Sequence, residues 1–146
     1  FLSIARGKIA EGIDFDNHYG RAVVVCGVPF QYTKSRLLLA RLEYMAKEKG
    51  IKESDFLIFD AIRQTAQCMG RVIRGKKDYG LMILADRVKI ISLTKRFVKS
   101  DKRDKLPNWI RVCFDESNNN ISTEIAIHNT RDYFKRMSQP YIIVNF

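Results

Sequence analysis

Apolar residues in this chain form two kinds of pattern, short continuous runs and longer stretches with helical spacing. Residues 21–27 contain a β-branched run bounded by Gly20 and Gly27, and residues 80–86 form a second run of the same kind. Such runs are typical of parallel strands that are covered on both faces. The short apolar stretch at residues 1–5 is consistent with a third, buried strand.

Helical spacing predicts a first helix over residues 34–49. Leu38, Leu42 and Met45 fall on one face of that helix, and Gly50 is a good C-cap residue. A last helix is predicted over residues 124–137, before Pro140, after a turn or disordered loop at residues 117–120.

Between them, a second helix is predicted from about residue 54 to Arg74, with Gly75 as its stop. Its apolar face recurs at steps of three and four: Phe59, Ile62, Ala66, Met69 and Ile73. Apolar strands that alternate with amphipathic helices predict an α/β domain with a mainly parallel sheet. Three strands are few for such a domain, so we expect sequence outside this chain to complete the sheet.

Composition adds a strong basic bias, with 26 Lys+Arg against 16 Asp+Glu and a formal charge of +10. That excess favours an anionic partner such as nucleic acid, although a solvated basic surface without a dedicated partner has the same composition. Cys26, Cys68 and Cys113 are widely spaced, which favours buried free thiols in a reducing compartment over a metal site. No apolar run reaches the length of a membrane span, so we expect no membrane partner.

Residues 70–77 nearly match the phosphate-binding P-loop, G-x-x-x-x-G-K-[ST]. A P-loop follows a strand and precedes a helix, whereas here the pattern predicts a helix before and a strand after. Lys77 also stands where a Ser or Thr hydroxyl would hold magnesium. The segment is therefore not expected to cradle phosphates as a P-loop does.

The second helix instead offers a polar stripe at steps of four, four and three: Arg63, Gln67, Arg71 and Arg74. Two guanidiniums one helical turn apart can act as arginine fingers on a transferring phosphoryl group. An exposed basic helix face has the same spacing and stays open as the alternative.

Two motifs make a family resemblance specific. Gln67-x-x-Gly70-Arg71-x-x-Arg74 resembles motif VI of superfamily 2 helicases, and ARGKIAEGIDF at residues 5–15 resembles their motif V. Longer matches, including HYGRAVVVCGVPF, AQCMGRVIRGKKDYGLMILAD and DKRDKLPNWI, resemble the XPD family of iron–sulfur DNA helicases. The resemblance implies part of the second RecA-like lobe over residues 1–140, with a truncated tail at residues 141–146.

The resemblance implies a role for each motif residue. Arg71 and Arg74 match arginines that reach the γ-phosphate, with Gln67 beside them. The residues matched to nucleotide contacts are Glu11, Gly12, Asp14 and Gly70, although an ordinary strand-to-turn junction also explains Glu11 to Asp14. Arg6, Lys8 and Arg36 are the candidates for DNA phosphates, with surface ion pairs as the alternative.

A basic stretch matches the region from which a nuclear import signal is inferred in that family: Lys95, Arg96, Lys102, Arg103 and Lys105. A solvated loop explains it equally well. Residues 87–94 interrupt the family pattern and are interpreted as an insertion: an extension of the preceding strand, a loop at its end or a retained non-coding stretch.

The implied function is that of a fragment of an ATP-dependent 5′→3′ DNA helicase, acting in nucleotide excision repair and transcription initiation within TFIIH in the nucleus. ATP and magnesium would be bound mainly by a first RecA-like lobe, and a 4Fe-4S cluster would lie elsewhere, so the fragment alone is expected to be inactive. Implied partners are single-stranded DNA, that first lobe and the TFIIH core subunits. The alternative is a non-catalytic nucleic-acid- or protein-binding module derived from a helicase lobe.

Overall fold

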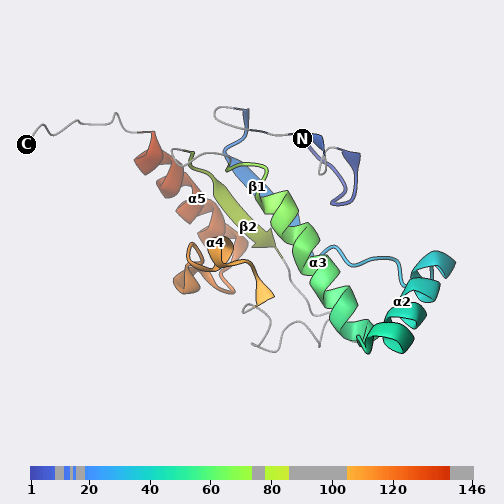
Figure 1. Cartoon of the computed structure of the whole chain (residues 1–146). Coiled ribbons are helices and arrows are strands. Elements are labelled where there is room, and N and C mark those ends of the chain that lie inside the picture. Colours follow the sequence, from blue (N-terminus) through green and yellow to red (C-terminus); the bar gives the residue numbers. More distant parts are fainter. Residues whose placement is uncertain (9–11, 14, 16–18, 74–77, 86–104, 139–146) are drawn as a thin grey trace, which may run out of the picture. The chain divides into compact units, whose positions relative to one another are not determined.

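The structure is a computed structural model, and the residues that it describes are 1–8, 12, 13, 15, 19–73, 78–85 and 105–138 (Figure 1). The chain divides into two compact units, Phe1–Val112 and Cys113–Phe146. The first unit holds the sheet and both motifs, and the second holds a single long helix. The insertion at residues 87–94 and the tail at residues 141–146 lie outside the described residues.

The sheet of the first unit consists, in the described residues, of β1 (Ala22–Cys26) and β2 (Leu81–Ala85). The strands pair in parallel, with a register from Ala22 opposite Leu81 to Cys26 opposite Ala85. The Gly27 N–H donates to the Ala85 carbonyl at 2.9 Å and extends the pairing by one residue. Both predicted strands and their parallel direction are confirmed, and so is the α/β class.

Arg21, the residue before β1, binds the residues at the start of β2. Its carbonyl accepts from the Leu81 N–H at 2.8 Å, and its guanidinium donates to the Tyr79 carbonyl at 3.1 Å. The same guanidinium lies 4.1 Å above the centre of the Tyr79 ring, a cation–π contact. These contacts fix Tyr79, two residues before β2, beside the start of β1.

One face of β1 forms the core with α3 (Glu53–Met69). Val25 is buried with Cys68, Met69 and Ile110, the last from α4 (Asn108–Arg111). Val24 is 52% exposed on the other face. The expectation that both faces of β1 are covered is therefore wrong within the described residues, because α3 covers one side of the strand only.

The uncovered face of β1 also explains why one of the cysteines is exposed. Cys68 is buried, as expected, whereas Cys26 and Cys113 are exposed. Cys26 ends β1 on the same side as Val24, and strand residues two apart share a face. The prediction of buried thiols is therefore wrong for Cys26 and Cys113.

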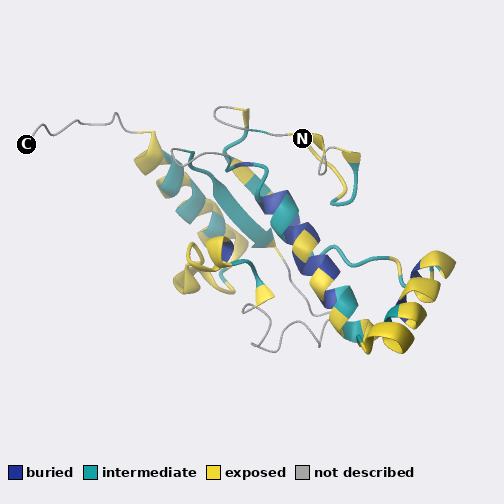
Figure 2. Ribbon diagram, in the orientation of Figure 1, coloured by how far each residue is buried: buried dark blue, intermediate teal, exposed yellow. Residues whose placement is uncertain are grey.

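The first predicted helix is α2 (Arg36–Lys49), which begins two residues after the expected start. Leu38 and Leu42 are buried where α2 packs against α3 (Figures 1 and 2). Gly50 has φ 63° and its N–H donates to the Met45 carbonyl, so the predicted C-cap is confirmed. Only glycine adopts that backbone without a steric cost.

The second helix, α3, ends at Met69, so the prediction that it extends to Arg74 is wrong. The chain turns after Gly70, and the Arg71 carbonyl accepts from the Phe15 N–H at 3.2 Å. That tertiary bond holds the turn outside the helix. Phe59, predicted on the apolar face, is 65% exposed, and Ile58 and Ala61 are buried instead.

Residues 1–5 form no strand, so that prediction is also wrong. Phe1 and Leu2 are fully exposed, and Ala5 is the residue of this stretch that packs against the core. The stretch is held by side chains of α3 that bond the Ala5 carbonyl, rather than by a neighbouring strand.

The second unit consists of a 3-10 turn (Glu116–Asn118) and α5 (Thr123–Met137). The helix predicted at residues 124–137 is confirmed, and Ser122 caps it by accepting from the Ile125 N–H at 3.3 Å. Within the described part of the chain, no helix is long and apolar enough to span a membrane.

Candidate functional site

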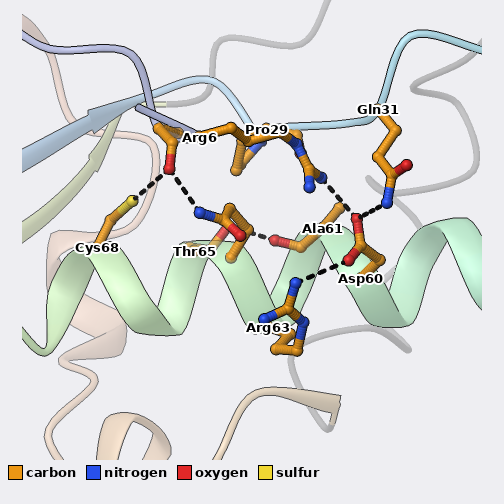
Figure 3. A network of polar contacts seen from close by, with 10 residues as sticks. Arg6, Pro29, Gln31, Asp60, Ala61, Arg63, Thr65 and Cys68 are labelled. Atoms are coloured by element: carbon orange, nitrogen blue, oxygen red, sulfur yellow. Dashed lines mark hydrogen bonds and ion pairs between the residues drawn. The ribbon is translucent and has the colours of Figure 1, made fainter. Parts of the chain in front are cut away.

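The beginning of motif V is docked on α3 through a row of side chains four residues apart. Asp60, Gln64 and Cys68 occupy one face of the helix, because steps of four return to the same side. Gln64 is 1% exposed and donates to the Ala5 carbonyl at 2.5 Å, and the Cys68 thiol donates to the same oxygen at 3.7 Å (Figure 3). Burial raises the pKa of Cys68, although the positive charges of Arg71 and Arg6 oppose it. The thiol therefore stays protonated as a donor.

The Asp60 carboxylate is the centre of a polar network at the other end of this row (Figure 3). One oxygen accepts from Arg6 at 2.6 Å and from Gln31 at 2.5 Å, and the other accepts from Arg63 at 3.0 Å. Arg6 also donates to the Pro29 carbonyl at 2.8 Å. The network ties α3 to the motif V segment and to the loop that follows β1.

The pKa of Asp60 follows from these contacts. Burial alone raises the pKa of the carboxyl group, because it removes water from the charged form. The hydrogen bonds from Gln31, Arg6 and Arg63 together outweigh burial and bring the pKa below its ordinary value. Asp60 is therefore ionised at neutral pH.

An open pocket of about 440 Å³ lies beside this network. Its charged and polar lining includes Arg6, Arg41, Arg63, Asp60, Gln31 and Ser35. Three guanidiniums against one carboxylate make the lining cationic, which suits an anionic group better than a cation.

Motif V and motif VI meet at Arg71. Its guanidinium donates to the Ile13 carbonyl at 3.3 Å, and its own carbonyl accepts from the Phe15 N–H. Gly12 has open space around the position that a Cβ atom would take, so a ligand can approach its backbone closely. A guanidinium beside an accessible glycine is a donor set that fits an anionic phosphate.

The structure places some of the predicted catalytic residues and not others. Gln67 is half-buried in the last turn of α3, and Arg71 lies in the turn beyond it. The predicted continuous stripe is therefore wrong as a helix face, because the helix ends between Gln67 and Arg71. Arg74, Glu11 and Asp14 lie outside the described residues.

The predicted DNA residues lie in different surroundings. Lys8 is exposed, and Arg36 is the exposed first residue of α2. The Arg6 guanidinium is held by Asp60 and Pro29 instead of extending into solvent. Of the predicted import signal, Lys105 is exposed, and the other four residues, Lys95, Arg96, Lys102 and Arg103, lie outside the described residues.

Sequence reasoning missed Asp60, Gln64 and Gln31. A signal was present, because Asp60 and Gln64 are polar residues at four-residue spacing within the helix side that also carries Cys68. The partners could not be read from that signal, since Ala5, Arg6 and Gln31 are distant in the sequence. Among the described residues, no group of three or more His, Cys, Asp or Glu side chains is arranged to bind a metal ion.

Comparison with known proteins decides the family. The profile of the helicase C-terminal domain matches residues 1–113. The chain belongs to the helicase C-terminal domain family. Gly12 and Arg71 both lie within the matched residues. In the structure Arg71 hydrogen-bonds the backbone of Ile13 and Phe15, which follow Gly12.

Named relatives are similar over almost the whole chain. The general transcription and DNA repair factor IIH helicase subunit XPD of Arabidopsis thaliana is 57% identical over 97% of this chain. The XPD subunit of Schizosaccharomyces pombe is 51% identical over 96%, and the XPD/RAD3 subunit of Saccharomyces cerevisiae is 54% identical over 95%. The expected resemblance to XPD helicases is confirmed. This helicase C-terminal domain spans 17–18% of the length of those relatives.

Proposed function

We propose that this chain is the nucleotide-facing and DNA-facing part of the second motor lobe of an XPD-type, ATP-dependent 5′→3′ DNA helicase. The observation that carries the proposal is the pair of bonds between Arg71 and the segment of Ile13 and Phe15. They bring motif VI and motif V together beside the accessible backbone of Gly12. The whole protein would act in nucleotide excision repair and transcription initiation within TFIIH in the nucleus.

The chemistry asked of this lobe is the stabilisation of charge on a transferring phosphoryl group. Arg71 and Arg74 supply guanidinium donors that reach the γ-phosphoryl oxygens of ATP, and Gln67 supplies a polar contact beside them. Such arginines contribute about 10³–10⁵ to the rate of phosphoryl transfer in NTPases. Glu11, Gly12, Asp14 and Gly70 would contact the nucleotide or respond to its state.

Other parts of the reaction belong to other parts of the protein. The first RecA-like lobe would hold ATP and magnesium through its P-loop, and a 4Fe-4S cluster would lie elsewhere in the protein. Single-stranded DNA would contact Lys8 and Arg36 through its phosphates, with Arg6 close by. The other proposed partners are the TFIIH core subunits, and the stretch from Lys95 to Lys105 would serve nuclear import.

The proposed transition-state role is tested by Arg71→Ala and Arg74→Ala in the whole protein. Each substitution is expected to lower the turnover of DNA-stimulated ATP hydrolysis by about 10³-fold or more, while the Kd for ATP changes little. Arg131→Ala, which removes an exposed arginine from α5 in the second unit, is the matched control.

The outcomes separate the candidate functions. Equal losses in turnover and in ATP affinity would contradict a role confined to the transition state. Unchanged hydrolysis in both variants would favour a non-catalytic nucleic-acid- or protein-binding module.

The division of labour gives a second test. The purified 146-residue chain is expected to show no DNA-stimulated ATP hydrolysis, because it supplies no P-loop. Phosphate release is measured with and without single-stranded oligo(dT). Robust hydrolysis by the chain alone would contradict the proposal.

A further inference from the structure

Asp60 joins segments that are far apart in the sequence. Its carboxylate accepts from Arg6, 54 residues earlier, and from Gln31, 29 residues earlier. It also accepts from Arg63 on its own helix. Figure 3 shows these side chains converging on Asp60 from the motif V segment, from the loop after β1 and from α3.

The contacts make this carboxylate hard to replace. Asp60 is 7% exposed, and a buried charge is tolerated only with hydrogen-bond partners around it. An ionised carboxylate accepts at both oxygens, and its bonds to guanidinium groups are shorter and stronger than neutral ones. An asparagine at this position would present an amide N–H₂ to one set of donors, so part of the network would be lost.

The loop held by this network leads directly to a predicted DNA residue. Residues 28–35 run from the end of β1 to α2, whose first residue is Arg36. Asp60 holds this loop twice, through the Gln31 amide and through Arg6, which itself donates to the Pro29 carbonyl. The position of the loop relative to α3 is therefore set through Gln31 and Arg6.

The other end of the same helix leads into the nucleotide motif. α3 ends at Met69, and the turn after it places Arg71 against Ile13 and Phe15. One rigid helix therefore contacts the loop before Arg36 near its middle and the motif VI turn at its end.

We propose that Asp60 is a positioning residue: through Gln31 and Arg6 it fixes the loop of residues 28–35 to α3, and thereby sets how strongly DNA stimulates ATP hydrolysis. The fixing of the loop is inferred from the contacts alone, whereas the effect on DNA stimulation rests on the proposed function. In this proposal Asp60 acts through the loop and is given no direct contact with ATP or DNA.

The experiment compares Asp60→Asn with Asp55→Asn in the whole protein. Asp55 lies on the same helix and is exposed, so its substitution removes the same charge without touching the network. Asp60→Asn is expected to raise the oligo(dT) concentration needed for half-maximal ATPase stimulation by about tenfold, which corresponds to the loss of one charged hydrogen bond. The turnover at saturating oligo(dT) is expected to change by less than about twofold.

Hydrogen exchange followed by mass spectrometry gives the readout that does not depend on activity. Amides of residues 28–35 are expected to exchange faster in Asp60→Asn than in wild type or Asp55→Asn. Gln31→Ala, which removes one arm and leaves the buried carboxylate paired with Arg6 and Arg63, is expected to cause the same two effects to a smaller extent. It serves as the test if Asp60→Asn fails to fold.

Each outcome has one meaning. Unchanged exchange in residues 28–35 would overturn the positioning role, and faster exchange with an unchanged DNA requirement would overturn its link to DNA. Equal losses of turnover with and without DNA would show a purely structural role and also overturn the proposal. Absence of DNA-stimulated hydrolysis in the wild-type protein would instead overturn the proposed function, and the exchange data would still decide the positioning role.

Discussion

At the scale of single residues, buried polar groups on α3 decide where the motif V segment lies. Gln64 and Asp60 are both buried, and both bond segments near the N-terminus. In the folded state these bonds replace the hydrogen bonds to water that the partners make in the unfolded chain. Each side chain therefore sets a specific position, and its removal would leave a partly buried group unpaired.

Asp60 makes the stability of this region depend on pH. Its pKa is lower in the folded state than the ordinary value of about 3.9, so its contribution is complete above that pH and is lost as the pH falls through the folded pKa. Asp60→Asn is expected to destabilise the protein by about 2 kcal/mol at pH 7.

The difference in unfolding free energy between wild type and Asp60→Asn should therefore narrow below about pH 4. Urea unfolding of both proteins from pH 7 to pH 3 measures it, and Asp55→Asn controls for loss of a carboxylate. A gap that stays constant across this range would show that ionisation of Asp60 is not what stabilises the network.

Gln64 gives a separate prediction. Gln64→Ala is expected to cost about 2 kcal/mol of unfolding free energy, because the half-buried Ala5 carbonyl loses a donor and a cavity is left where the buried Gln64 side chain was. Gln67→Ala on the same helix removes a half-buried side chain of the same type and should cost less than about 1 kcal/mol. Similar losses for both would mean that the bond to Ala5 contributes little.

The residue scale also shows the limit of reading a sequence. Arg71 was predicted in the functional site from its motif, and the structure gives it a contact with motif V. Asp60 was not predicted, because a single carboxylate in a helix is usually exposed and its spacing from Gln64 does not show what it bonds. Its role depends on Arg6 and Gln31, which only folding brings to it.

At the scale of elements, β1, β2 and the first and last helices could be predicted from the sequence, whereas the strand expected at residues 1–5 is not formed. A β-branched run between two glycines located β1, an apolar run after Gly80 located β2, and Gly50 located the end of α2. The end of α3 was placed too late, because the apolar spacing continues through Ile73. Just beyond the end of α3 the Arg71 carbonyl accepts a hydrogen bond from the Phe15 N–H, and helical periodicity contains no information about that partner.

The glycines that follow α2 and α3 are expected to respond differently to substitution by alanine. Gly50 has φ 63°, whereas Gly70 has φ −67° and room for a methyl group at ordinary contact distances. Gly50→Ala is expected to cost about 1 kcal/mol of unfolding free energy, and Gly70→Ala is expected to be neutral or to stabilise by up to about 1 kcal/mol.

Thermal and urea unfolding of both variants tests this difference between the helix ends. If Gly70→Ala were as destabilising as Gly50→Ala, the turn after α3 would need a backbone that only glycine adopts. A loss of ATPase activity in Gly70→Ala without a loss of stability would instead support the predicted contact of Gly70 with the nucleotide.

At the scale of the whole molecule, the charge of +10 becomes meaningful only through its placement. Arg6 is an arginine that composition counts as basic surface, yet it is neutralised locally by Asp60. Arg36 and Lys8 are exposed and are the better candidates for DNA phosphates. The overall charge therefore overstates the number of groups that bind nucleic acid.

Salt dependence tests that distinction. Arg36→Ala is expected to reduce the slope of log K against log salt concentration for oligo(dT) binding by about 0.7, the value for one contact with a single strand. Lys49→Ala, at the opposite end of α2, removes one positive charge and should leave the slope unchanged. Fluorescence anisotropy at several salt concentrations measures both, and equal slopes for wild type and Arg36→Ala would exclude a phosphate contact there.

The parallel pairing of the two strands also has a consequence for how the chain is made. β1 ends at Cys26 and β2 begins at Leu81, so α2 and α3 are synthesised before β1 meets its partner. Pairings across such a separation form late in folding, and an unpaired β-branched edge attracts other chains. A nascent chain therefore carries β1 without its β2 partner, and prone to aggregation, until synthesis has passed residue 85. A product that terminates before residue 81 never gains that partner.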